Sequence, residues 1–70
     1  MSKWFEVEIT AVKVVCVEMP DEATEEEAVS FAWMECGLDP GFITESTQWE
    51  LKDAQQRDTA IRHADQVEYL

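Results

Sequence analysis

The sequence has little positive charge, few glycines and prolines, and no long apolar run. Five lysines and arginines stand against 16 aspartates and glutamates, so the formal net charge of the 70 residues is −11. This shortage of cations disfavours direct binding to nucleic acid or to an anionic membrane surface, because both contacts need basic side chains. No apolar run approaches the roughly 20 residues that cross a bilayer, and the N-terminus lacks a charged-then-apolar leader. We therefore expect neither a membrane span nor an export signal.

Cysteine and histidine are too scarce to suggest a metal centre. The chain has two cysteines, Cys16 and Cys36, and one histidine, His63. They form no Cys-x-x-Cys or Cys/His spacing of the kind that binds zinc. The acidic residues lack the glycine and the ligand spacing of a calcium loop. We expect two buried, reduced thiols, no metal and no cofactor.

Catalytic motifs are also missing. Neither Ser30 nor Ser46 lies in a glycine-rich nucleophile elbow, and His63 has no nucleophile beside it in the sequence. A pair of carboxylates acts as acid and base only in a cleft that separates their pKa values, and so short a chain has little material for such a cleft. We expect a protein that is not an enzyme and has no catalytic residue.

The hydrophobic share of 46% is nevertheless too high for an acidic disordered tail, so the chain is expected to fold. Its length allows one small domain, residues 1–70, with a core over about 3–53 and a tail over 54–70. A chain of this size builds only a modest core. Formation of a homodimer is one way to add to it.

Two strands are expected at the start of the chain. Lys3 to Thr10 alternates between apolar and polar residues, which is typical of a half-buried strand, and Val12 to Met19 is a second β-rich run. We favour a hairpin near Thr10-Ala11 over one bent strand, because a single strand of about 16 residues would be unusual. One face of the first strand holds Phe5, Val7 and Ile9, and the other holds Trp4, Glu6, Glu8 and Thr10.

The stretch from Met19 to Gly37 is expected to contain the main helix. Thr24 followed by Glu27 matches a capping box. The glutamates of the first turn suit the positive end of the helix dipole. Gly37 suits the residue just past a helix that ends near Cys36.

This helix carries two apolar groups. A helix on a sheet needs only one apolar stripe, and Phe31 and Met34 lie on roughly the opposite side from the expected one. Either the tail or a loop around Phe42 covers these two side chains, or they contact another molecule. The expected inward stripe consists of Val29, Ala32, Trp33 and Cys36.

Beyond the helix, Asp39-Pro40-Gly41 predicts a turn. Thr47 to Lys52 predicts a third strand with Trp49 and Leu51 pointing inward. The tail from Asp53 onward is ambiguous, because it could form a helix capped by Asp53 or add an edge strand over its last residues. The predicted fold is α+β, a three-stranded antiparallel sheet in the order ββαβ with one main helix packed on it.

The acidity exceeds what solubility requires, since a net charge of about 2 to 8 in magnitude suffices for a small domain. Glu6 and Glu8, two residues apart on a strand, lie ~7 Å from each other, on the scale of successive phosphates. Such a surface can occupy the basic groove that another protein uses for nucleic acid. A solvated acidic face with dipole-complementary capping is the alternative. The predicted partner-binding residues are Glu6, Glu8, Asp21, Glu22, Glu25, Glu26, Glu27, Trp4, Phe31 and Met34.

The order strand, strand, acidic capped helix, strand resembles the small ββαβ domains encoded by phages and plasmids, such as the DpnD/PcfM-like family. That family has no established activity to carry over. In size and acidity the chain is also similar to phage anti-CRISPR and anti-restriction proteins, many of which bind host defence complexes and some of which imitate DNA. The segments that match the first pattern are Phe5-Glu6-Val7-Glu8-Ile9, Val15-Cys16-Val17-Glu18, Glu25-Glu26-Glu27-Ala28 and Trp49-Glu50-Leu51.

Two hypotheses follow. The first is a non-enzymatic inhibitor in the bacterial cytosol that binds a basic nucleic-acid-binding protein, such as a CRISPR effector or restriction enzyme, and blocks access of DNA or RNA by charge mimicry. The second is a homodimeric interaction or adaptor protein whose contact is made by Phe31, Met34 and Trp4, with acidity serving solubility alone. Neither involves direct binding to nucleic acid or membrane.

Overall fold

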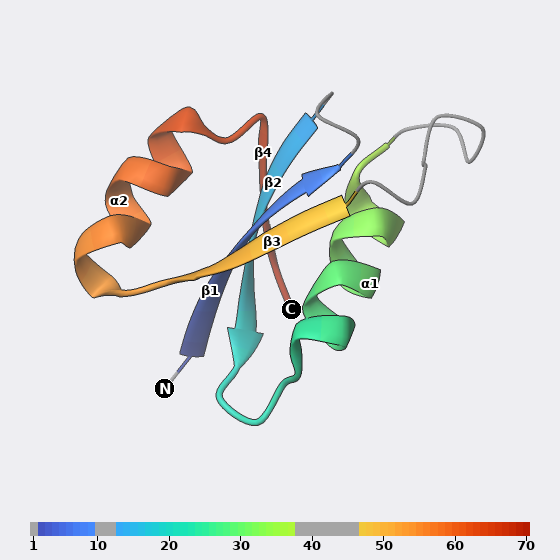
Figure 1. Ribbon diagram of the computed structural model, residues 1–70, viewed down its shortest axis with the longest axis horizontal. Helices are drawn as coiled ribbons and strands as arrows, with labels where there is room; N and C mark the ends of the chain where they lie inside the picture. Colours follow the sequence, from blue (N-terminus) through green and yellow to red (C-terminus); the bar gives the residue numbers. More distant parts are fainter. Residues whose placement is uncertain (1, 10–12, 38–46) are drawn as a thin grey trace.

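The computed structural model describes residues 2–9, 13–37 and 47–70, and it forms an α+β fold with six elements (Figure 1). The predicted turn at Asp39-Pro40-Gly41, the loop around Phe42 and the hairpin turn near Thr10-Ala11 lie outside these residues. The elements are β1 (Ser2–Ile9), β2 (Lys13–Pro20), α1 (Glu25–Glu35), β3 (Thr47–Lys52), α2 (Ala54–His63) and β4 (Gln66–Tyr69).

The sheet has four strands in the order β3-β1-β2-β4. β1 pairs antiparallel with β2, and Phe5 lies opposite Val17. β1 also pairs antiparallel with β3, so that Phe5 lies opposite Leu51 as well. β4 joins the far edge parallel to β2. The predicted pairing of the first two strands is confirmed, but the three-stranded antiparallel sheet was incomplete, because the fourth strand makes the sheet mixed.

The tail forms a helix and then a strand, where the sequence left these as alternatives. Asp53 caps α2, its side chain accepting from the backbone N–H of Gln55 and Gln56 at 2.9 and 2.8 Å. The chain then turns at Asp65, whose backbone N–H donates to the Val14 carbonyl at 2.8 Å. The tail is long enough for both elements, because the helix takes ten residues and the strand takes four.

The two helices lie on opposite faces of the sheet, α1 on one side and α2 on the other (Figure 1). The topology explains this arrangement. The connection through α1 runs from β2 across β1 to β3, and the connection through α2 runs back from β3 to β4. Right-handed crossovers in opposite directions place their helices on opposite faces. The prediction of one main helix was therefore incomplete, because α2 covers the second face of the sheet.

The core lies between α1 and the sheet. The apolar faces of the two long strands point toward α1, which packs on β1 and β2. The sheet contributes Phe5, Val7, Ile9, Val15, Val17 and Met19, and the helix and the turn before it contribute Ala23, Ala28, Ala32 and Cys36.

Helix α1 packs on the sheet through its small residues rather than its large ones. Ala28, Ala32 and Cys36, spaced four apart, are fully buried, and short side chains let the helix approach the sheet closely. Val29 and Phe31 pack half-buried on either side of this row. The predicted stripe was wrong in placing Trp33 inward, since its side chain is 38% exposed.

Both ends of α1 follow the sequence prediction. Thr24 and Glu27 form a capping box, in which the Glu27 N–H donates to the Thr24 hydroxyl at 3.2 Å and the Thr24 N–H donates to Glu27 Oε1 at 3.1 Å. Gly37 has a φ of 74°, in the left-handed region that favours glycine. The Lys13 ammonium donates to the Cys36 carbonyl and so ties the helix end to β2.

Strand β3 is less covered than predicted. Trp49 and Leu51 point to the same face as the core residues opposite them in β1, but 46% and 50% of their surfaces are exposed. The reason is that α1 packs on β1 and β2 and stops short of this edge strand. The inward orientation was therefore right and the expected burial was wrong.

Candidate partner-binding surface

The start of α1 presents a dense group of carboxylates to solvent. Asp21 and Glu22 in the preceding turn and Glu25, Glu26 and Glu27 in the first helical turn are all exposed. The first turn of a helix favours such residues, because unpaired backbone N–H groups and the dipole give it positive character. We call these five residues the acidic helix start.

Within the part of the chain that the structure describes, the four glutamates of this group form no ion pair with a basic side chain. The ion pairs there join Lys52 to Glu6 and Glu50, and Arg57 to Asp58. The sequence from 14 to 51 contains no lysine, arginine or histidine. Lys3 and Lys13, the basic residues nearest in sequence on the N-terminal side, donate to backbone carbonyls of Ala23 and Cys36. The four glutamates of the acidic helix start therefore keep a negative field that no ion pair offsets.

Glu6 and Glu8 do not belong to the same surface as the acidic helix start. Alternation along β1 turns them to the face that α2 covers, away from α1. Glu6 is half-buried and its carboxylate lies 3.8 Å from the Lys52 ammonium. Glu8 is exposed, near Gln48 and Glu50. The sheet thus separates the two acidic groups that the sequence suggested as one field.

Trp4 packs within the chain on the α2 face. Its ring meets the edge of the Tyr69 ring at a centroid distance of 5.5 Å. The Arg57 guanidinium carbon lies 5.9 Å from the Trp4 ring centroid, within cation–π range. Trp4 is therefore engaged by β4 and α2 and lies apart from the acidic helix start.

Phe31 and Met34 line a groove of about 410 Å³ between α1 and the C-terminal end of the chain. Phe31 packs half-buried against the core, whereas Met34 is 76% exposed. Met19 and Leu70 complete the apolar part of the lining, and Glu26, Glu27, Thr24 and Ser30 complete the polar part. The tail reaches this groove through Leu70 but leaves Met34 open.

A second groove of about 440 Å³ runs along the other side of α1, between the helix and β3. Trp33 and Trp49 are its large apolar residues, and sequence reasoning missed both as surface residues. The signal that could have found them is the pair of alanines, Ala28 and Ala32. Two small residues four apart predict that the helix packs closely on the sheet at this point, so that larger neighbouring side chains lie at the edge of the contact. The groove is lined by Glu25, Glu26, Val29, Ser30, Trp33, Thr47 and Trp49.

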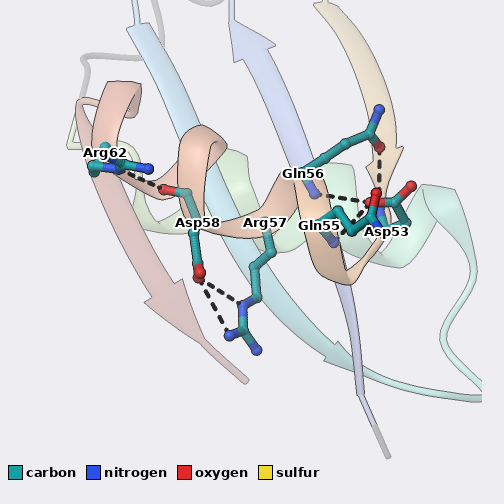
Figure 2. A network of polar contacts seen from close by, with 6 residues as sticks. All are labelled: Asp53, Gln55, Gln56, Arg57, Asp58 and Arg62. Carbon is teal, nitrogen blue, oxygen red and sulfur yellow. Dashed lines mark hydrogen bonds and ion pairs between the residues drawn. The ribbon is translucent and has the colours of Figure 1, made fainter.

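The α2 side is held by short-range polar contacts, shown in Figure 2. The capping box of Asp53 and Gln56 begins the helix, and Arg57 pairs with its neighbour Asp58 at 3.3 Å. The Arg62 side chain donates to the Asp58 carbonyl at 3.4 Å. These bonds serve the helix itself, and they give α2 a mixed charge that contrasts with the acidic helix start.

Both cysteines are free and buried, as predicted. Cys16 faces the α2 side, opposite Glu6 in the strand register, while Cys36 belongs to the core on the α1 side. Burial, reinforced by the charge of Glu6 and opposed by that of Lys52, raises the pKa of the Cys16 thiol to about 11. A thiol of this kind is a poor nucleophile at neutral pH.

The described residues contain no cluster of three or more histidine, cysteine or acidic side chains suited to a metal ion. His63 is exposed in the last turn of α2. None of the described helices is long and apolar enough to cross a membrane. A scan of protein-family models and searches of curated proteins and of solved structures find no match for this chain.

Proposed function

We propose that this protein is a non-enzymatic binding protein whose acidic helix start docks on a basic, nucleic-acid-binding surface of another protein. The observation that carries the proposal is that the carboxylates of Glu22, Glu25 and Glu26 are exposed and form no ion pair within the described residues. Two grooves with apolar walls flank the same helix. Charge for attraction and apolar area for affinity therefore lie side by side.

The expected mechanism is competition. Carboxylates of the acidic helix start take the place of phosphates in a groove lined by lysine and arginine, and the field of a chain with net charge −11 steers the encounter. The apolar grooves then slow dissociation, because buried apolar contacts determine much of the lifetime of a complex. Glu6 and Glu8, on the other face, are not needed for this contact.

The resemblance to phage anti-CRISPR and anti-restriction proteins gives the target class that we propose. It is a host defence complex in the bacterial cytosol, such as a CRISPR effector or a restriction enzyme. Inhibition would then consist of denying DNA or RNA its binding groove.

Capture followed by competition tests the proposal. The protein is used as bait in nuclease-treated bacterial lysate, captured proteins are identified by mass spectrometry, and each is assayed for DNA and RNA binding. We expect a captured nucleic-acid-binding protein whose nucleic acid is displaced by the wild-type chain. Unchanged nucleic-acid binding at saturating concentrations of the chain would show the proposal to be wrong.

A matched pair of variants locates the contact. Glu25→Gln, Glu26→Gln and Glu27→Gln together remove three charges, and glutamine at 27 still completes the capping box with Thr24. The control removes three charges on the α2 side through Glu8→Gln, Glu50→Gln and Asp58→Asn. We expect the first variant to lose at least about tenfold in affinity, equivalent to about 1.4 kcal/mol, and the control to lose much less.

A homodimer through Met34 is the second candidate, and the 76% exposure of this side chain beside Leu70 favours it. Charge opposes it, since each copy carries −11. The sequence had suggested that Trp4 joins Phe31 and Met34 in this contact, but Trp4 packs on the α2 face against Tyr69 and Arg57. Sedimentation of the wild type and of Met34→Asp separates the two candidates, because only a dimer of this kind would dissociate in the variant.

A further inference from the structure

The groove between α1 and β3 has two tryptophan rings held in place. The indole N–H of Trp33 donates to the Thr47 hydroxyl at 3.2 Å, which ties the helix side chain to the edge strand. Trp49 meets Phe5 edge to face, with ring centroids 6.0 Å apart and planes at 66°. Both rings remain partly exposed. They therefore offer aromatic surface with little freedom left to lose on binding.

Carboxylates stand at one end of this aromatic surface. Glu25, Val29 and Trp33 are four residues apart, so they form one row along the side of α1 that faces β3. Helical side chains lean toward the N-terminus, which is the direction in which Val29 and Glu25 lie from Trp33. Glu26 lines the same groove. An occupant therefore meets apolar and aromatic surface first and negative charge beyond it.

This order of surfaces selects a cation on an aliphatic stem. An anion is repelled, and a purely apolar group leaves the carboxylates without a partner. The guanidinium of arginine stacks on tryptophan, is weakly hydrated and can donate two hydrogen bonds from its edge to a carboxylate. Lysine carries a compact, strongly hydrated charge that stacks less well. The contact of Arg57 with Trp4 shows the same pairing inside this chain.

We propose that the groove between α1 and β3 binds an arginine side chain of the partner protein. The guanidinium lies against Trp33 and Trp49, and its charge is balanced by Glu25 and Glu26. This inference rests on the proposed function and supplies its specificity, since it assigns arginine rather than basic charge in general. A second copy of the chain is a poorer occupant, because two molecules of net charge −11 repel each other.

The three tryptophans allow the test to be resolved by residue. Each of Trp4, Trp33 and Trp49 gives one indole N–H signal in a ¹H–¹⁵N NMR spectrum, assigned by single Trp→Phe variants. The probe is a capped Gly-Arg-Gly-Arg-Gly peptide, titrated at low salt. The controls are the same peptide with citrulline, which keeps the shape and removes the charge, and with lysine. We expect saturable shifts at Trp33 and Trp49 with the arginine peptide, a small shift at Trp4, and weaker binding of both control peptides.

Two matched variants complete the design. Glu25→Gln with Glu26→Gln removes the charges at the groove, and Glu8→Gln with Asp58→Asn removes two charges from the other side. The first variant loses the exposed ion pair and keeps the aromatic contact, so we expect about fivefold weaker binding in the first variant and less than twofold in the second. The rest of each spectrum reports whether the variant is folded.

The inference is overturned if Trp4 shifts as much as Trp33 and Trp49, if citrulline or lysine peptides bind equally well, or if the two double variants weaken binding alike. Failure of this inference can be distinguished from failure of the proposed function. Displacement of nucleic acid from the partner at wild-type concentrations by a folded Trp33→Ala chain, which keeps every carboxylate of the acidic helix start, would retain the proposed function and exclude this groove. Arginine binding without any such displacement would retain the groove and exclude the function.

Discussion

Cys16 has a small side chain in an environment that opposes its ionisation. It lies buried on the α2 side of the sheet, directly across from Glu6, and both burial and this carboxylate favour the neutral thiol. Because burial and Glu6 outweigh the opposing charge of Lys52, the thiol stays protonated at neutral pH and packs as a small apolar side chain. The sequence had predicted a buried, reduced thiol at this position, and Cys16 is free and buried.

The raised pKa of Cys16 predicts a loss of stability at alkaline pH. The ordinary value is 9.0 and the folded value is about 11. A group whose folded pKa is raised contributes fully below its unfolded pKa, and this contribution falls as pH rises toward the folded pKa. The hydrogen bond to Glu50 raises the pKa of Lys52 as well, which adds a decline in the same direction. We expect the free energy of unfolding, measured in urea, to decrease between about pH 9 and 11.

The Cys16→Ala variant provides the control for this prediction. It removes the thiol and leaves Lys52 in place, so its stability should fall less steeply over the same range. Iodoacetamide adds a kinetic test at pH 8, where Cys16 should react slowly in the folded chain and rapidly in urea. Equal pH dependence in wild type and variant would contradict the assignment to this thiol.

At the scale of elements, the two helices begin with the same capping motif but are stabilised by different interactions. Each starts with a capping box, formed by Thr24 and Glu27 in α1 and by Asp53 and Gln56 in α2. The α1 helix also buries Ala28 and Ala32 in the core, whereas Ala60 is the buried residue of α2. Local bonds therefore carry more of the stability of α2, and packing carries more of that of α1.

The cap of α1 gives a prediction for this scale. Thr24→Ala removes the hydroxyl that accepts the Glu27 N–H, and loss of an N-cap costs about 1 kcal/mol. The free energy of unfolding should fall by about this amount. Thr59→Ala in the exposed interior of α2 is the matched control. It should be neutral or stabilising, because alanine is the better helix former by up to about 0.7 kcal/mol. Equal destabilisation by both changes would argue against the cap.

At the scale of the whole molecule, the charge is distributed unevenly between the α1 side and the α2 side. The α1 side carries the acidic helix start, and the α2 side contains Arg57, Arg62 and His63 among its acids. The molecule measures 34 × 24 × 17 Å. This length is comparable with the Debye length of about 30 Å at 0.01 M salt, so at low salt every charge acts on every other.

Salt should therefore have opposite effects on folding and on binding. Raising NaCl from 0.01 to 1 M shortens the Debye length to about 3 Å and screens the self-repulsion of the free chain, so its Tm should rise. The same salt should weaken binding to a basic partner steeply. Calorimetry measures the first effect and titration with the captured partner the second. The Glu25→Gln, Glu26→Gln, Glu27→Gln variant should show a smaller change in both, and identical salt responses would show that these three residues are not the source.

The sequence by itself determined the features that depend on near neighbours. Alternation gave the first strand its apolar face, the spacing of Thr24 and Glu27 gave the helix start, and Gly37 gave its end. These are contacts within about four residues, and side-chain chemistry alone is enough to specify them. The net charge and the lack of a metal-ligand or catalytic motif likewise required no structure.

Only the tertiary structure decided which of these features share a surface. Helix α1 packs on the apolar face of β1, which leaves Glu6 and Glu8 on the other face, away from the acidic helix start. Ala28 and Ala32 pack closely on the sheet, which leaves Trp33 at the edge of the helix–sheet contact. There it lines a groove together with Trp49, which comes from a strand distant in sequence. The physical reason is that the order of the strands and the strand that each side of a helix meets depend on the whole packed core, and no local pattern encodes them.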